Sequence, residues 1–231
     1  MHLQDYQDKF KHISFVRKDG ILQLTIHYQG GEAIWTPAEG GLHTELGRAF
    51  YAVAHYPENK VVILTGTGDV FLTRMDTAGN LLEIEVPMIA AINGPVHIHS
   101  ELPTLCDIVI ASETASFADK AHLTSGTVPG DGVHVWWPML LGPNRGRSFL
   151  LTGEEIPAAE AKTLGFVAEV VPKDEVVSRA WEVAHSMAEK PDQVLRYTRI
   201  ALTQHIKRRL IDDLGYGLQL EGLGILEAMG K

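Results

Sequence analysis

The stretch with the richest chemistry runs from Phe117 to Trp137 and reads FADKAHLTSGTVPGDGVHVWW. It carries His122 and, after a Pro-Gly bend whose glycines free the backbone, Asp131. A carboxylate that bonds one imidazole nitrogen fixes the tautomer and leaves the other nitrogen free to accept a proton. Such a pair activates water as a general base. Asp131 can equally be only the N-cap of a helix that begins near Val133, and the residues alone leave both interpretations open.

Two further histidines, His97 and His99, are spaced i, i+2, so on an extended segment they share one face. A pair of this kind can bind a metal ion, but no cysteine or carboxylate stands at a usual ligand spacing, so we expect no metal site. His99 can also be a buried, hydrogen-bonded structural residue. Glu101 follows, where it can be an acid in the first turn of a short helix, favoured by the helix dipole.

Charge and composition exclude several classes of protein. The 231 residues carry 20 Lys and Arg against 29 Asp and Glu, a net charge of −9, without a basic block. Neither nucleic acid nor an anionic membrane is therefore an expected partner. The single cysteine, Cys106, excludes an internal disulfide and indicates a reducing compartment, for which we expect the cytoplasm. The N-terminus shows no apolar signal core, and no apolar run has the length of a membrane span.

The elements that must position these side chains follow from the apolar patterning. Residues 13–28 alternate around a Lys-Asp-Gly turn, which predicts a β-hairpin. Continuous apolar runs at 61–65, 88–92 and 108–111 predict buried strands, typical of a parallel sheet covered on both faces, and a further strand is expected at 167–171. Helices are expected at 42–56, at 100–106, from 133, at 144–152, at 158–164, from a cap at Asp174 to 190, at 194–209 and at 211–229. We expect one catalytic core over residues 1–190 and a C-terminal helical region over 191–231.

Five segments follow one another in fixed order between Val61 and Pro172: VVILTGTG, PMIAAINGPV, SELPTLCDIVIASETASF, VPGDG and LGPNRGRSFLLTGEEIPAAEAKTLGFVAEVVP. Their sequences and their order resemble the crotonase (enoyl-CoA hydratase/isomerase) superfamily, and the resemblance extends over nearly the whole chain. The resemblance implies an α/β fold, a spiral of ββα units with a C-terminal helical region. It also implies a homotrimer or a hexamer made of two trimers.

Two segments depart from the members that act on coenzyme A thioesters. Those members carry glycine-rich segments after the first buried strand and after the Asn-Gly turn, and their backbone N–H groups form an oxyanion hole. Here the corresponding segments are FLTRMD, which begins at Phe71, and VHIH, which begins at Val96. Glu101 stands where one hydratase carboxylate would be, and His122 lies near the second. This pattern resembles the 6-oxocamphor hydrolase-type β-diketone hydrolases, which cleave carbon–carbon bonds by a retro-Claisen reaction without coenzyme A.

Carried over motif by motif, the resemblance implies that His122 and Asp131 activate water, that His99 stabilises the oxyanion and that Glu221 assists. The branch uses no cofactor, and its partner is a small diketone substrate. The pocket would be lined by Trp35, His43 and Phe71.

Three classes of function follow. The first is a hydrolase acting on a carbon–carbon bond of a 1,3-diketone, probed by loss of the absorbance of a cyclic diketone. The second is a coenzyme A thioester hydratase, isomerase or hydrolase with a modified oxyanion hole, which binding of an acyl-CoA would support. The third is a catalytically silent interaction protein, against which a complete dyad argues. The stretch from Asp76 to Leu81, which flanks the expected pocket, is shorter than in the diketone branch, either by deletion or because a segment is absent from this sequence.

Overall fold

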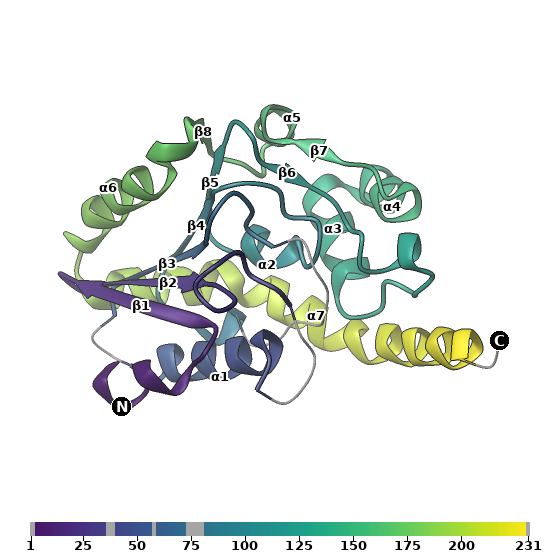
Figure 1. The fold of residues 1–231 in the computed structure, drawn as a ribbon, viewed down its shortest axis with the longest axis horizontal. Helices are drawn as coiled ribbons and strands as arrows, with labels where there is room; N and C mark the ends of the chain where they lie inside the picture. Colours follow the sequence, from purple (N-terminus) through teal and green to yellow (C-terminus); the bar gives the residue numbers. More distant parts are fainter. Residues whose placement is uncertain (1–2, 36–39, 57–58, 73–80, 230–231) are drawn as a thin grey trace.

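The computed structural model describes residues 3–35, 40–56, 59–72 and 81–229. At its centre is a six-stranded sheet in which β1 pairs antiparallel with β2 and the remaining neighbours pair in parallel (Figure 1). A small second sheet joins β6 to β7. In the order of the large sheet the strands are β1 Ile13–Lys18, β2 Ile21–Ile26, β3 Val61–Gly66, β4 Met88–Ile92, β5 Ile108–Ser112 and β8 Glu169–Val171, and the small sheet holds β6 Ser116–Phe117 and β7 Ile156–Pro157.

The predicted hairpin is confirmed, and its turn explains its register. Asp19 and Gly20 take positive φ angles of 53° and 79°, which suit the tight turns that match the twist of two antiparallel strands. Lys18 therefore pairs directly with Ile21. On the edge away from β1, strand β2 pairs in parallel with β3.

Both faces of the sheet are covered, which explains the continuous apolar runs. Successive side chains of a strand point to opposite faces, so Val61 and Ile63 join one apolar cluster while Val62 and Leu64 join the other. Helix α6, residues Val176–Ala188, packs on the first face. Helix α1, residues Leu42–Ala54, packs into the larger cluster on the second face. The predicted α/β class with a buried parallel sheet is confirmed.

The remaining helices surround the second sheet and close the fold. Helix α2 is shorter than the predicted 100–106, and α6 does not begin at a cap on Asp174. Asp174 lies inside a 3-10 turn, and Glu175 occupies the N-cap position without a side-chain hydrogen bond, so the predicted cap is wrong. The helices are α2 Glu101–Thr104, α3 Val133–Leu141, α4 Pro143–Thr152, α5 Ala158–Leu164 and α7 Asp192–Met229, with 3-10 turns η1 Leu3–Asp5, η2 Gln7–Lys9, η3 Leu81–Glu83, η4 Leu123–Ser125 and η5 Lys173–Glu175.

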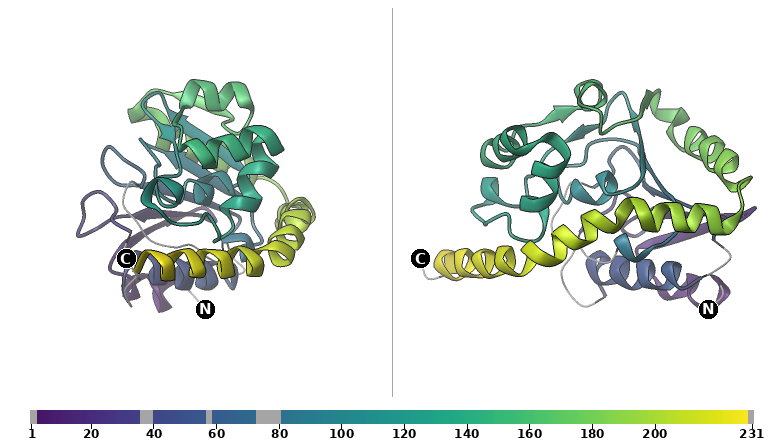
Figure 2. Two further views of the ribbon diagram at one scale, coloured as in Figure 1. Left: turned by 90° about the vertical axis from the view of Figure 1, so that its right-hand side faces the viewer. Right: turned by 180° about the vertical axis from the view of Figure 1, so that it is seen from behind.

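Helix α7 is one helix of 38 residues, so the predicted division into two helices is wrong. No glycine or proline stands at the predicted break near Leu210, and the backbone ladder continues through it. Its N-terminal half is anchored by Arg199, 1% exposed, which donates hydrogen bonds to the carbonyl of Ile84 and to Asp107, the latter at 2.6 Å. Its C-terminal half extends beyond the rest of the molecule (Figures 1 and 2). The division into residues 1–190 and 191–231 stays a prediction.

In the part of the chain that the structure describes, no helix combines the length and the hydropathy of a membrane span.

Candidate active site

The loop from β6 to α3 holds His122 against a carboxylate that the sequence interpretation did not include. Nδ1 of His122 lies 2.8 and 2.9 Å from the two oxygens of Asp119. The backbone N–H of Ala121 also donates to Asp119 at 3.2 Å, and both side chains are almost fully buried. The Nδ1–H donates to Asp119, so the orientation of the ring is fixed and Nε2 faces the other way. The signal was available, because Asp119 stands three residues before His122.

Asp131 faces that second nitrogen. Its Oδ1 lies 3.3 Å from Nε2 of His122, and its Oδ2 lies 3.7 Å from Nδ1 of His99, with 5% of the side chain exposed. The N-cap position of α3 belongs to Gly132, whose φ of 117° suits glycine, so Asp131 is not the capping residue. Asp131 therefore stands between two imidazoles. The expected free nitrogen on His122 is not found, because both of its nitrogens face carboxylates.

Two glycines let α7 approach the loop that carries Asp131. A side chain at Gly130 would meet the carbonyl oxygen of Gly217 at 2.1 Å, and one at Gly217 would meet the His134 ring at 2.2 Å. The loop and the helix thus touch backbone to backbone. One turn further along α7, Glu221 is 8% exposed and offers a carboxylate oxygen within 4.8 Å of ligand atoms of His122 and Asp131.

His99 lies on the other side of Asp131. Its Nδ1 is 2.7 Å from Oε1 of Glu101, and its ring centre is 4.8 Å from that of Trp35. Nε2 of His99 and Nε1 of Trp35 are both buried, and neither finds a hydrogen-bond partner among the described residues. Two ring nitrogens, on rings whose centres are 4.8 Å apart, are thus left for a ligand oxygen. A buried polar group without a partner is costly, so such groups cluster where a ligand supplies the bond.

His97 does not share this site. Its Nε2 lies 3.0 Å from the hydroxyl of Ser116 and 3.4 Å from Glu155. His99 takes a left-handed φ of 48°, which interrupts the extended backbone that would place the two histidines on one face. The predicted i, i+2 pairing of these side chains is therefore wrong.

The other predicted pocket residues lie at different distances from this centre. His43, on α1, has its ring centre 5.7 Å from that of Trp35. Phe71 is 1% exposed and belongs to the larger apolar cluster of the core. The rest of the segment that begins at Phe71, together with the shortened stretch before Leu81, falls largely on residues 73–80, outside the described residues.

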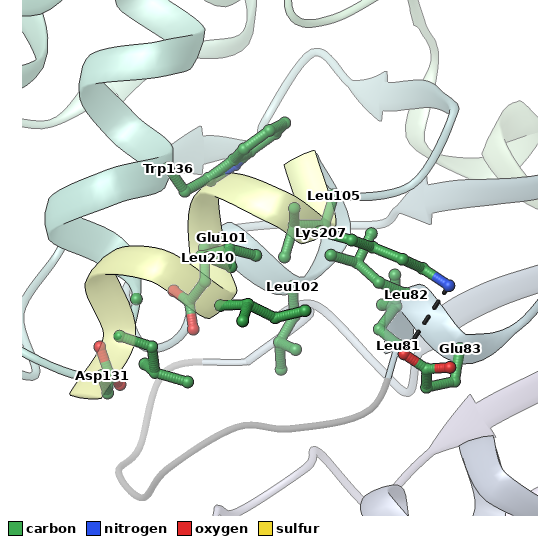
Figure 3. A pocket seen from close by; sticks show the side chains of 13 residues that line it. Leu81, Leu82, Glu83, Glu101, Leu102, Leu105, Asp131, Trp136, Lys207 and Leu210 are labelled. Atoms are coloured by element: carbon green, nitrogen blue, oxygen red, sulfur yellow. Dashed lines mark ion pairs between the residues drawn. The ribbon is translucent and has the colours of Figure 1, made fainter. Parts of the chain in front are cut away.

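A cavity of about 320 Å³ opens beside Glu101 and Asp131 between α2, α3, α7 and η3 (Figure 3). Lys207 and Glu83, whose charged atoms are 3.7 Å apart, lie at the end opposite Asp131. The walls between the two ends are apolar, with carboxylates at one end and an ion pair at the other. These walls are formed by Leu81, Leu82, Leu102, Leu105, Trp136, Leu210, Ile211 and Leu214, with Gly132 beside Asp131.

Charges within the site determine where its protons lie. Burial lowers the pKa of His122, but the hydrogen bonds of Asp119 and Asp131 outweigh it and raise that pKa to about 10. Burial raises the pKa of Asp131, but the hydrogen bond and charge of His122 and the charge of His99 bring it below its usual value. Burial lowers the pKa of His99, but the charge and hydrogen bond of Glu101 and the charge of Asp131 raise it above its usual value. His122 is therefore doubly protonated at neutral pH, double protonation of His99 is favoured, and Asp131 is ionised.

Two sets of side chains lie close enough to be considered for a metal ion: His99 with Glu101 and Asp131, and His122 with Asp131 and Glu221. In the first set, the contact of 2.7 Å between His99 and Glu101 leaves room for a shared proton and not for a cation. In the second set, Nδ1 of His122 is hydrogen-bonded to Asp119, and Nε2 faces the Asp131 carboxylate at 3.3 Å. The close contacts between imidazoles and carboxylates in both sets suit proton transfer.

Comparisons with known proteins identify the family of the chain. Residues 72–221 match the enoyl-CoA hydratase/isomerase family. The fold superimposes with a TM-score of 0.92 on a β-diketone hydrolase from the cyanobacterium Anabaena sp. PCC 7120 bound to (S)-3-oxocyclohexyl acetic acid, 41% identical over 97% of this chain and 98% of that one. An enoyl-CoA hydratase from Mycobacterium tuberculosis H37Rv gives a TM-score of 0.83 at 26% identity over 93% of this chain and 99% of that one.

Among relatives by sequence, a probable peroxisomal enoyl-CoA hydratase of Arabidopsis thaliana is 29% identical over 196 residues, 77% of this chain and 72% of the relative. The match to the family spans well over half of the chain, and the similarity to the β-diketone hydrolase extends over almost all of it. The chain therefore belongs to the crotonase (enoyl-CoA hydratase/isomerase) superfamily and resembles its β-diketone hydrolase branch.

Proposed function

We propose that this chain is a hydrolase that cleaves a carbon–carbon bond of a cyclic 1,3-diketone by a retro-Claisen reaction. The observation that carries the proposal is two buried nitrogens without a described partner, Nε1 of Trp35 and Nε2 of His99, on rings 4.8 Å apart, of which the His99 ring lies 6.3 Å from that of His122. They stand in for the backbone donors that the glycine-rich segments supply in coenzyme A enzymes. The 41% identity to a β-diketone hydrolase supports the same reaction.

The reaction places three demands on the site: activation of water, stabilisation of an oxyanion and protonation of a carbon atom. The oxygen of water first bonds to one carbonyl carbon, which produces the oxyanion. The bond between that carbon and its neighbour then breaks, and its electrons pass to the second carbonyl as an enolate. The enolate carbon finally takes a proton, so that water is consumed and a carboxylic acid and a ketone are formed.

Asp131 and His122 meet the first and last demands as one unit. The ionised Asp131 accepts a proton from water while that water attacks the carbonyl carbon. His122, which enters the reaction protonated, gives its Nε2 proton to the enolate carbon. The proton on Asp131 then passes across the 3.3 Å contact to Nε2, which restores the starting state. Asp119 keeps His122 oriented through both steps. Because the two groups interact strongly, their protons belong to the pair.

His99 and Trp35 meet the second demand. In a nearly dry site, an N–H aimed at a developing oxyanion is worth far more than in water, and loss of one such donor costs ~3 kcal/mol of transition-state stabilisation. The protonated His99 can donate from Nε2 while Glu101 accepts from Nδ1. Trp35 donates only from Nε1, so it needs no change of protonation. Glu221, next to His122 and Asp131, is a second group placed to reprotonate the carbon.

A coenzyme A thioester enzyme is the alternative, favoured by the names of the sequence relatives and by Glu101 at the position of a hydratase carboxylate. A single assay separates the two. Purified protein is incubated with cyclic 1,3-diketones in ¹⁸O-labelled water and, separately, with crotonyl-CoA. We expect loss of diketone absorbance, one labelled oxygen in the carboxylic acid, and no hydration of crotonyl-CoA. Hydration of crotonyl-CoA without diketone cleavage would contradict the proposal.

We also propose that copies of the chain associate through the C-terminal half of α7 as a trimer or as a dimer of trimers. Large apolar side chains are exposed there, among them Ile211, Leu218, Leu223 and Leu226 at 78%, 48%, 63% and 67%. A stripe of this kind typically marks a protein–protein contact. Light scattering that gives the mass of a monomer at micromolar concentration would contradict this assembly.

A further inference from the structure

Glu101 lies at the turn into α2 and contacts His99 directly. Oε1 of Glu101 is 2.7 Å from Nδ1 of His99, and the two side chains are 8% and 1% exposed. His99 takes a left-handed φ of 48°, two residues before Glu101, which is the first residue of α2.

The contact decides what the other nitrogen of His99 can do. A neutral imidazole that donates from Nδ1 has only a lone pair at Nε2, and a lone pair repels an oxyanion. His99 can donate from Nε2 in that orientation only if the ring carries two protons. Burial raises the pKa of Glu101 above its usual value, while the charge and hydrogen bond of His99 act against that rise. An ionised Glu101 and a doubly protonated His99 at hydrogen-bonding distance therefore stabilise one another.

The charged groups around His99 act in the same direction, with one exception. Asp131, from the loop before α3, lies 3.7 Å from Nδ1 and favours the protonated ring. His122, whose ring centre is 6.3 Å away, carries a positive charge and disfavours it. The aromatic neighbour Trp35 is neutral. Glu101 makes the shortest contact of these groups, and its charge is the largest single influence in favour of protonation.

We propose that Glu101 is a positioning residue that acts through His99: it keeps the ring doubly protonated and aims Nε2–H at the oxyanion. This inference rests on the proposed diketone hydrolysis for its catalytic consequence, but the contact itself can be tested without a substrate. It differs from a direct role in acid–base chemistry, which the position of Glu101 on the cavity wall would also permit (Figure 3).

The variant Glu101→Gln keeps the size of the side chain and removes its charge. The matched control is Glu189→Gln, which removes the same charge from an exposed position at the C-terminus of α6. The ring signals of His99 are followed by NMR as a function of pH in wild type and in both variants. The signals are identified by their absence from the spectrum of His99→Gln.

In wild type, we expect His99 to titrate above the ordinary value of 6.5. In Glu101→Gln its titration should move by about one pH unit or more toward acid, and in Glu189→Gln it should not move. A wild-type His99 that titrates at or below 6.5, or an unchanged titration in Glu101→Gln, would overturn the inference. The titration of His99 in the wild-type protein tests the inference even if the Glu101→Gln variant does not fold.

Kinetics on a diketone that wild type cleaves then separate positioning from direct catalysis. A positioning role predicts that Glu101→Gln keeps most of its kcat at acidic pH and loses activity at a lower pH than wild type. An equal loss of kcat at every pH would overturn the inference in favour of a direct role. If wild type cleaves no diketone, the proposed function fails, whereas the NMR titration still tests the link between Glu101 and His99.

Discussion

The two histidines that we propose to be catalytic, His99 and His122, differ in what faces Nε2. Both rings are buried, and each has Nδ1 against a carboxylate, Glu101 for His99 and Asp119 for His122. Nε2 of His122 then meets Asp131 at 3.3 Å, whereas Nε2 of His99 has no hydrogen-bond partner among the described residues. In the proposed reaction, the carboxylate at Nε2 makes His122 part of a proton-transfer pair, and the unpartnered Nε2 leaves His99 to bind the oxyanion. The partner of the second nitrogen would therefore decide which task each ring performs.

The largest effect should follow from the loss of the proton-transfer pair. General acid–base catalysis contributes ~10²–10⁴-fold, so His122→Ala should lower kcat on the diketone by at least ~10². Adding Asp131→Asn to that variant should cost little more, because residues that act as one unit are not additive. Steady-state kinetics of the two single variants and the double variant check this. Independent, multiplying losses would show that the two residues do not form a unit.

A smaller effect is expected at the oxyanion site. Trp35→Phe keeps the aromatic packing and removes one N–H, so kcat should fall by up to ~10²-fold while KM changes little. Trp137→Phe is the matched control, because Trp137 also has a buried indole N–H but packs on Phe149 in the core. Its activity should stay close to that of wild type. An active Trp35→Phe variant would assign the oxyanion to His99 alone.

The pH dependence should distinguish a resting imidazolium from a free base. A neutral His122 with the ordinary pKa of 6.5 would give a rate that rises through that pH. We expect instead no rise through pH 6.5 and a fall at alkaline pH as His99 and His122, the latter with a pKa of about 10, lose their protons. A pH–rate profile on the diketone checks this. A rise centred near 6.5 would support the free-base mechanism.

The same protonation contributes to stability, with a defined sign. The folded-state pKa of His122 lies above its unfolded value, so its stabilisation is fully present below pH 6.5 and is lost as the pH rises toward about 10. Thermal unfolding of wild type should therefore weaken over that range. His122→Ala should show a flatter dependence, which separates this group from the other titrating residues.

The smallest effect is expected from metal removal. If both rings are used for protons, incubation with EDTA should leave turnover of the diketone unchanged. The purified protein should also carry no stoichiometric transition metal by elemental analysis. Activity that EDTA abolishes and zinc restores would replace the proton-transfer account with a metal-dependent one.

Much of the fold was predictable, because its signals are local. The Lys-Asp-Gly turn and the apolar runs specified the hairpin and the buried strands, since a strand covered on both faces needs apolar residues at successive positions. The continuous α7 was missed although no helix-breaking residue separates Arg209 from Ile211. The predicted cap at Asp174 lies one residue before the N-cap residue Glu175, within the usual uncertainty of helix ends.

The candidate site was harder to predict, because its contacts join distant segments. The loop sequence pointed to His122 and Asp131, but the approach of α7 depends on the Gly130–Gly217 contact between residues far apart in the chain. Asp119 was missed although it is only three residues from His122, because one carboxylate already explained the histidine. The link from Glu101 to His99 depends on a left-handed backbone at a non-glycine residue, which sequence patterns do not reveal.

The most direct test of the central claim is Asp131→Asn, since Asp131 contacts both histidines. Asparagine preserves the shape of the side chain but cannot accept the proton of water as a carboxylate does. We predict that kcat on the diketone falls by at least ~10²-fold while the Tm stays nearly unchanged. Asp174→Asn, an exposed change of the same kind, should alter neither value. An Asp131→Asn variant that keeps most of its activity would contradict the assignment of Asp131 and His122 as the water-activating pair.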